Sequence, residues 1–158
     1  MGSDRFCDMG RRGQPLDGVR VIDAHAHLGF CQIGVLASSA ERMVRVMDRI
    51  GVEKVAISSF AAIGPDAELG NDAVRRVVDK YPDRFIGYAA VNPNYTSEVS
   101  TLLERCFSGN QFKAIKIHPS FHDYPVCGEG YAEVYEFANS RGIPILSHTW
   151  GSADILEK

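Results

Sequence analysis

Short apolar runs recur along this 158-residue chain at intervals of about thirty residues. Each run is nearly continuous in apolar character, which is typical of strands that are buried on both faces of a parallel sheet. The pattern therefore predicts five buried strands, at residues 19–27, 54–60, 85–93, 112–119 and 143–149.

Segments with helical spacing of apolar residues separate the runs. The first, residues 38–51, begins with a capping box formed by Ser38 and Glu41 and ends at Gly51. The second, residues 71–82, starts with a capping Asn or Asp and stops at Pro82. Two further helices are predicted at residues 97–107 and 129–142.

An alternation of strand and helix predicts an α/β fold with a parallel sheet covered by helices. Two architectures satisfy this pattern. One is an incomplete (β/α)8 TIM barrel of about five βα units, because a whole barrel needs about 250 residues. The other is a five-stranded doubly wound sheet, and periodicity alone leaves both open.

Composition narrows the class of protein. The chain is 45% hydrophobic and 23% charged, with a net charge of −3, which suits one globular domain and gives no basic footprint for nucleic acid or a membrane. We expect residues 1–17 to be a flexible N-terminal tail and residues 18–158 to form the domain. The four scattered cysteines and the absence of an apolar leader favour a cytoplasmic protein.

Histidines stand at the carboxyl ends of three predicted strands, where parallel α/β folds bind ligands. His25 and His27 alternate along the first strand, and two imidazoles on one face can reach a single ion at about 2.0–2.1 Å. His148 at the end of the fifth strand is the natural third ligand, and such a site would acidify a bound water. A chance H-x-H pair without metal is the alternative.

Four further residues are candidates for substrate binding. An inward-facing Lys116 on the fourth strand is costly unless paired, so it either bridges to Asp23 or contacts an anionic substrate; a metal-binding carbamate is the less favoured reading. His118 is a substrate contact or a turn residue. His122 and Trp150 follow strand ends, and each either contacts substrate or serves the loop structure.

Motifs for other common chemistries are absent from the sequence. No G-x-G-x-x-G follows the first strand, no G-x-x-x-x-G-K-[ST] occurs, and there is no G-x-S-x-G elbow. Dinucleotide binding, P-loop chemistry and serine hydrolysis therefore lack their characteristic loops.

Three segments together resemble the amidohydrolase superfamily: IDAHAHLG at 22–29, AIKIHPSF at 114–121 and PILSHTWG at 144–151. They are most similar to the amidohydrolase-related branch of metal-dependent TIM-barrel hydrolases and decarboxylases. The likeness extends from about residue 19 to the C-terminus.

The resemblance implies one divalent metal ion, with zinc expected, held by His25, His27 and His148. It implies hydrolysis of an amide, ester or lactone in a small-molecule substrate, or alternatively decarboxylation. The family also uses a histidine on the sixth strand and a catalytic aspartate on the eighth, which would lie beyond Lys158. We therefore expect the N-terminal portion of a longer enzyme, weak or inactive by itself. A homo-oligomer, in which a second copy completes the barrel, is the alternative to a longer chain. A flavodoxin-like binding module and a non-catalytic metal-binding fragment are the alternative functions.

Overall fold

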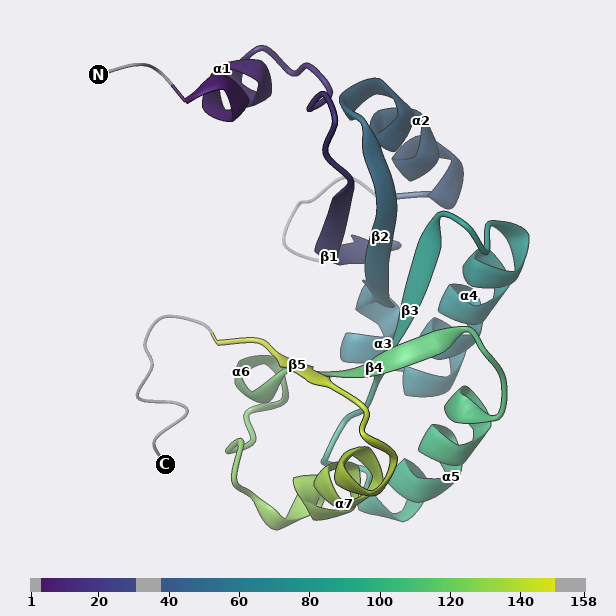
Figure 1. Cartoon of the computed structure of the whole chain (residues 1–158). Coiled ribbons are helices and arrows are strands. Elements are labelled where there is room, and N and C mark those ends of the chain that lie inside the picture. The colour runs from purple at the N-terminus through teal and green to yellow at the C-terminus, as the bar shows by residue number, and fades with distance from the viewer. Residues whose placement is uncertain (1–3, 31–37, 150–158) are drawn as a thin grey trace.

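The five strands lie in the sheet in the order in which they occur along the chain, β1-β2-β3-β4-β5, and all are parallel. The computed structural model describes residues 4–30 and 38–149, and the sheet curls so that the molecule is a crescent (Figure 1). The elements are α1 (Arg5–Arg11), β1 (Val21–Leu28), α2 (Ala40–Ile50), β2 (Val52–Ser59), α3 (Phe60–Ile63), α4 (Ala67–Lys80), β3 (Phe85–Ala90), α5 (Thr96–Phe107), β4 (Phe112–Ile117), α6 (Pro119–His122), the 3-10 helix η1 (Glu129–Tyr131), α7 (Ala132–Arg141) and β5 (Ile145–Ser147).

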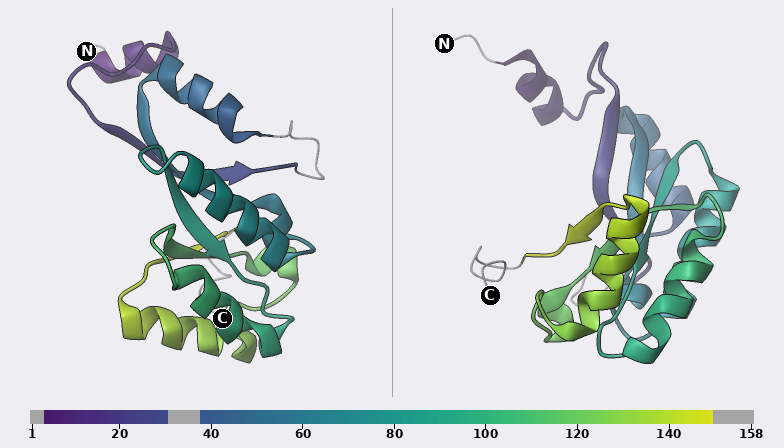
Figure 2. Two further views of the ribbon diagram at one scale, coloured as in Figure 1. Left: turned by 90° about the vertical axis from the view of Figure 1, so that its right-hand side faces the viewer. Right: turned by 60° about the horizontal axis from the view of Figure 1, so that its bottom comes forward.

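The strand order and the position of the helices identify the architecture. Helices α2, α4, α5 and α7 cover the convex face of the sheet, and within residues 4–30 and 38–149 no such layer covers the concave face (Figures 1 and 2). A doubly wound sheet would instead reverse its strand order at a switch point and carry helices on both faces. The incomplete TIM barrel is therefore confirmed, and the alternative of a doubly wound sheet is wrong.

The hydrophobic core lies between the convex face of the sheet and the helices. Ile57, Ala89 and Ile115 from the three central strands are fully buried, and they belong to one cluster with Val74 of α4 and Leu103 of α5. Along each strand, the residues that belong to this core alternate with residues whose side chains point to the concave face. The core thus fixes which side chains of each strand face the concavity.

Two predicted helix starts are wrong by a few residues. Ser39, rather than Ser38, caps α2, because its hydroxyl accepts a hydrogen bond from the Arg42 amide at 3.3 Å. Helix α4 begins four residues earlier than predicted, because the Asp66 carboxylate accepts a hydrogen bond from the Leu69 amide at 2.8 Å. Gly51 ends α2 as expected, with a φ of 74°.

The first strand is not buried, in contrast to the prediction from its apolar run. Val19 is 42% exposed and Ile22 is 49% exposed, and most side chains of β1 are accessible. Among the described residues β1 pairs only with β2, so one of its edges has no neighbouring strand. The three residues of β5, at the other edge, are half-buried. Full burial holds only where strands have neighbours on both sides.

The predicted tail contains a seven-residue helix, α1, none of whose residues is buried. Two more short helices were not predicted. Helix α3 begins directly after β2, at Phe60, and α6 begins at Pro119, two residues after the end of β4, so both start within the predicted strands 54–60 and 112–119. None of the helices in the described segments is long and apolar enough to cross a bilayer.

Salt bridges on the convex surface connect successive helices. Lys80 of α4 pairs with Glu41 of α2 at 2.7 Å, and Arg105 of α5 pairs with Asp72 of α4 at 2.6 Å. Exposed pairs of this kind contribute little to stability individually because water screens them. The pairs show that α2, α4 and α5 are neighbours in this order on the convex surface.

Cys106 is expected to resist alkylation in the folded protein. Its thiol is 1% exposed, and burial raises its pKa to about 11, so little of the reactive thiolate forms at neutral pH. We expect iodoacetamide to modify the exposed Cys7 at least about 100-fold faster than Cys106, measured by mass spectrometry of tryptic peptides. In urea the two should react alike. Equal rates in the folded protein would contradict this packing.

Candidate metal centre

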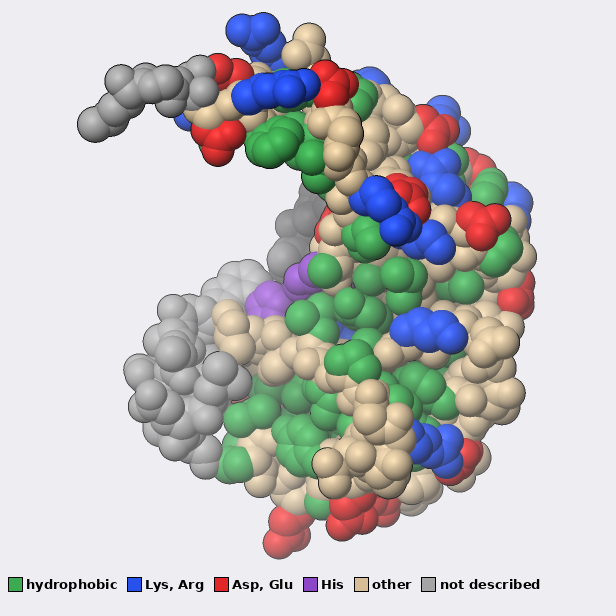
Figure 3. Space-filling view, viewed as in Figure 1, with side chains coloured by type: hydrophobic (Ala, Val, Ile, Leu, Met, Phe, Trp, Pro, Cys, Tyr) green, Lys and Arg blue, Asp and Glu red, His purple; other side chains and the backbone are tan. Residues whose placement is uncertain are grey.

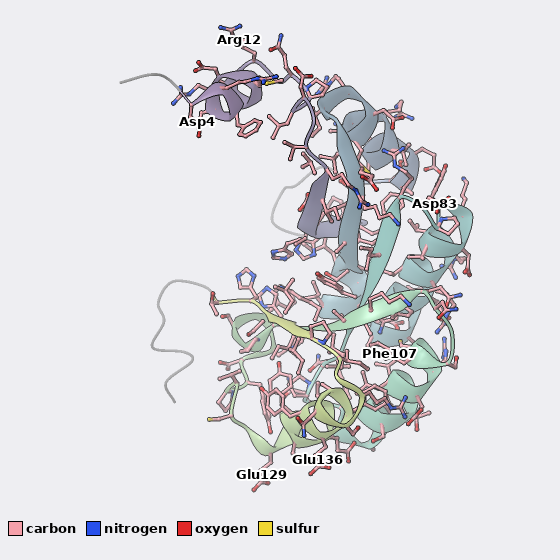
Figure 4. All side chains as sticks on the ribbon, in the orientation of Figure 1. Asp4, Arg12, Asp83, Phe107, Glu129 and Glu136 are labelled. Carbon is pink, nitrogen blue, oxygen red and sulfur yellow. The ribbon has the colours of Figure 1, made fainter. Side chains whose placement is uncertain are left out.

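Histidine side chains gather on the concave side of the crescent, where the carboxyl ends of the strands converge (Figure 3). Side chains from β1 and from the end of β5 project toward one another there (Figure 4). Asp83, which precedes β3, lies on the outer side, away from these rings (Figure 4). The structure thus brings together strand ends that are far apart in the sequence.

A bulge in β1 sets the positions of His25 and His27. Asp23 pairs with Val55 and Ala26 pairs with Ile57, so three steps on β1 match two on β2. The Asp23 carboxylate accepts the His25 backbone N–H at 3.0 Å, which holds the extra residue. The rings of His25 and His27 meet edge to face, with centroids 4.9 Å apart. Simple alternation along the strand could not predict this adjustment.

His27 is held by neighbours from the end of β2. Its Nδ1 lies 3.1 Å from the Ser58 hydroxyl, and its ring stacks on Phe60 with centroids 4.5 Å apart. Burial is the main cause that lowers the pKa of His27 to about 4, followed by the charges of His25 and Lys116. The imidazole is therefore neutral near pH 7, which is the form that binds metals.

Lys116 reaches the same histidine pair from β4. Its side chain is 1% exposed, and its Nζ lies 3.3 Å from Nε2 of His25. Burial lowers the pKa of Lys116 to about 8. The Lys116–Asp23 bridge considered from the sequence is absent from the ion pairs of residues 4–30 and 38–149, because Asp23 binds the His25 backbone instead.

His118 and His148 form a second pair beside the first. Their rings stack in parallel, with centroids 3.9 Å apart. His118 also caps α6, since its Nδ1 accepts the Phe121 amide N–H at 3.1 Å. Burial, and then the charges of His148 and Lys116, lower the pKa of His118 to about 4. His118 therefore has the structural role of capping α6 and also stacks on His148, while its role as a substrate contact stays a prediction.

His122 serves the framework around the site. Its Nε2–H donates to the Ile63 carbonyl at 2.6 Å, and its Nδ1 lies 3.3 Å from the hydroxyl of the fully buried Tyr131. Both ring nitrogens are engaged, so none remains for a substrate. We therefore assign His122 to the support of the loops after β2 and β4. Trp150, the remaining predicted contact, lies outside the described residues.

Three residues at the site were missed in the sequence. Ser58 and Phe60 contact His27, and Phe121 lies edge to face with His118 at 5.6 Å while remaining 55% exposed. All three share one signal, since each lies within four residues of the carboxyl end of β2 or β4. Side-chain type alone, serine or phenylalanine, does not separate them from ordinary core and loop residues.

The donors fit a divalent ion in their chemistry. Neutral imidazoles suit zinc and related metals, and a hydrogen bond to one ring nitrogen, as Ser58 makes with His27, orients such ligands. The positions of these donors, however, do not form a complete three-ligand site. Within residues 4–30 and 38–149, no three His, Cys, Asp or Glu side chains are grouped closely enough to hold one ion. His25 and His27 are adjacent, and His148 stands with His118 instead.

A separate cleft of about 610 Å³ lies beside the loops that follow β2 and β3. It is lined by Asp66, Glu68, Tyr95, Glu98 and Arg105 among others, and none of its lining residues is a histidine. Arg105 is already paired with Glu68 and Asp72. This cleft lacks the convergent imidazoles and the buried lysine, so the histidine cluster remains the candidate site.

Comparison with known structures places the fold among several enzymes. The 2,6-dihydroxybenzoate decarboxylase from Rhizobium aligns at 18% identity with a TM-score of 0.69, covering 84% of this chain and 50% of that one. A 5-carboxyvanillate decarboxylase from Novosphingobium aromaticivorans, complexed with manganese and 4-hydroxy-3-methoxy-5-nitrobenzoic acid, aligns at 18% with a TM-score of 0.70, covering 89% and 53%. The 4-oxalomesaconate hydratase from Rhodopseudomonas palustris aligns at 22% with a TM-score of 0.61, covering 82% and 52%.

This chain therefore spans about half the length of the solved structures that it matches. No curated protein sequence matches it. The sequence model of the amidohydrolase family matches residues 22–157, which is most of the chain and includes all five strands except the first residue of β1. On this match, the chain belongs to the amidohydrolase family.

Proposed function

We propose that this chain supplies the N-terminal half of the active site of a metal-dependent enzyme that acts on a small organic molecule. The observation that carries the proposal is the pair of imidazoles on β1, His25 and His27, next to the buried Lys116 at the carboxyl ends of the strands. His25 and His27 would hold a divalent ion, with His148 as third ligand. The bound ion would supply Lewis acidity.

Hydrolysis of an amide, ester or lactone is the first candidate reaction, with zinc as the expected ion. The chain's own residues would position the substrate: His118 and the exposed ring of Phe121, which meet edge to face, would contact it, and Phe60 would hold the His27 ring by stacking on it. Ser58 would keep the His27 ring oriented through its hydrogen bond at 3.1 Å.

Decarboxylation is a second candidate, and Lys116 favours it. A buried ammonium group with no carboxylate partner among the described ion pairs can bind an anionic substrate. Two of the similar structures above are decarboxylases by name, and one was solved with manganese. Two assays of the metal-loaded protein separate the reactions. A decarboxylase would release CO2 from an aromatic acid, whereas a hydrolase would open a lactone and release a proton.

We expect the protein to work in the cytoplasm.

The metal site is testable on the 158-residue chain itself. We expect the metal-stripped protein to bind one equivalent of Zn²⁺, measured by calorimetry, and His27→Ala to weaken binding at least about 100-fold, because removing a ligand costs more than removing its hydrogen-bond partner. His25→Ala and His148→Ala should behave similarly. Glu136→Ala is the matched control, since this exposed carboxylate lies on α7 far from the histidines (Figure 4). Unchanged affinity in all three histidine variants would refute the proposal.

A further inference from the structure

Lys116 is an isolated cation in the interior. It lies opposite Ala90 of β3, at the end of that pairing, and opposite Leu146 in the middle of the pairing with β5. Its side chain is 1% exposed, and none of the ion pairs in the described segments includes it. A buried charge without a counter-ion is costly, so the one close polar contact that its side chain makes among the described residues is important for its stability.

That contact joins two groups whose roles are fixed by chemistry. An ammonium group can only donate hydrogen bonds, so Nε2 of His25, 3.3 Å away, must accept. The proton of the neutral ring then resides on Nδ1. The lone pair of Nε2 points at Lys116 rather than into an open coordination position.

We infer that Lys116 is an internal cation that occupies the metal-binding lone pair of His25 when no metal is bound, so that it competes with the metal ion. This inference rests on the function proposed above. Two effects oppose metal entry: the Lys116–His25 hydrogen bond must break, and a positive charge stands close to the incoming divalent ion.

Removal of the charge should therefore tighten metal binding. We expect Lys116→Met to bind Zn²⁺ at least tenfold more tightly than the wild-type chain, measured by competition with a fluorescent chelator in bicarbonate-free buffer. Lys116→Gln, which keeps a polar end without the charge, should also bind more tightly. Lys113→Met is the matched control, because Lys113 lies on the same strand with an exposed side chain, and its affinity should not change. Circular dichroism should be used to check that each variant is folded.

A second measurement needs no metal. The ¹⁵N chemical shifts of the His25 ring in the metal-free protein should show the Nδ1–H form with an accepting Nε2, and Lys116→Met should change the Nε2 shift. The Lys113→Met shifts should match the wild type. A protonated Nε2 in the wild-type protein would overturn the inference.

Other outcomes separate the two proposals. If no variant and no wild-type protein binds Zn²⁺ through His25, the proposed metal site itself fails. If the wild type binds Zn²⁺ but Lys116→Met shows no gain, the competition alone is overturned. A loss of affinity in Lys116→Met, together with tighter wild-type binding on addition of bicarbonate, would also overturn it, because Lys116 would then act as a carbamate ligand.

Discussion

Replacing Gly70 with alanine is expected to lower the free energy of unfolding by about 2 kcal/mol or more. Gly70 lies in α4 at its contact with α3, and a Cβ atom there would stand 2.1 Å from the backbone nitrogen of Ala62 and 2.5 Å from its Cβ. Ala62 is fully buried, so it has no room to retreat. Alanine favours helices over glycine by about 1 kcal/mol, but the clash with backbone outweighs this gain.

The same substitution should also disturb the candidate site. Helix α3 begins at Phe60, whose ring stacks on His27, directly after Ser58 and Ser59 of β2. Pushing α3 away from α4 therefore displaces a neighbour of a proposed metal ligand. We expect a lower urea midpoint and weaker Zn²⁺ binding in the same variant.

Gly10→Ala provides the matched control for this experiment. Gly10 also lies in a helix, α1, but a Cβ atom there would meet nothing within 4 Å. Alanine at this position should leave the urea midpoint unchanged or raise it slightly. If Gly70→Ala were as harmless as Gly10→Ala, the close contact between α3 and α4 would be wrong.

Replacing Asn71 with leucine is expected to cost about 3 kcal/mol, because two buried backbone groups lose their hydrogen bonds. The Asn71 side chain is 2% exposed, donates to the Ala90 carbonyl at 2.8 Å and accepts from the Ala90 N–H at 2.9 Å. Strand β2 pairs with β3 only as far as Gly87. The Asn71 side chain therefore provides hydrogen-bond partners for Ala90, at the end of β3 that no longer pairs with β2.

Equilibrium unfolding in urea measures this effect, and the same change at Asn139 controls for it. Asn139 lies on α7 with an exposed side chain, so Asn139→Leu should alter stability by less than about 0.5 kcal/mol. Leucine has the same branching and the same number of side-chain heavy atoms as asparagine, so the substitution removes the hydrogen bonds without creating a cavity. Equal stability of the two variants would show that the Asn71 amide is not needed.

Much of the fold followed from local sequence. The spacing of apolar residues predicted five strands and four main helices, and the structure has them with ends shifted by a few residues. Glycines past the helix ends, such as Gly51 and Gly142, were identifiable because their left-handed φ angles, 74° and 63°, favour glycine. The capping residues Ser39 and Asp66 were harder, since several neighbouring residues can cap equally well.

The site was predictable in its position but not in its contacts. Histidines at strand ends could be recognised because parallel strands direct their carboxyl ends to one edge of the sheet. Whether Lys116 met Asp23 or His25 depended on the bulge that ties Asp23 to its own strand. Both ring nitrogens of His122 bind groups of the protein itself. Their partners, Ile63 and Tyr131, lie 59 and 9 residues away in the sequence, so these contacts could not be predicted from local sequence.

By itself the sequence determined the alternation of strands and helices and the histidines at the ends of the strands, because both follow from residues near one another along the chain. Only the tertiary structure decided that the strands lie in consecutive order, that β1 is an exposed edge, and that His25 meets a lysine 91 residues away. The physical reason is the curl of the sheet. It brings the strand ends together around one concavity, and no local pattern specifies which side chains then touch.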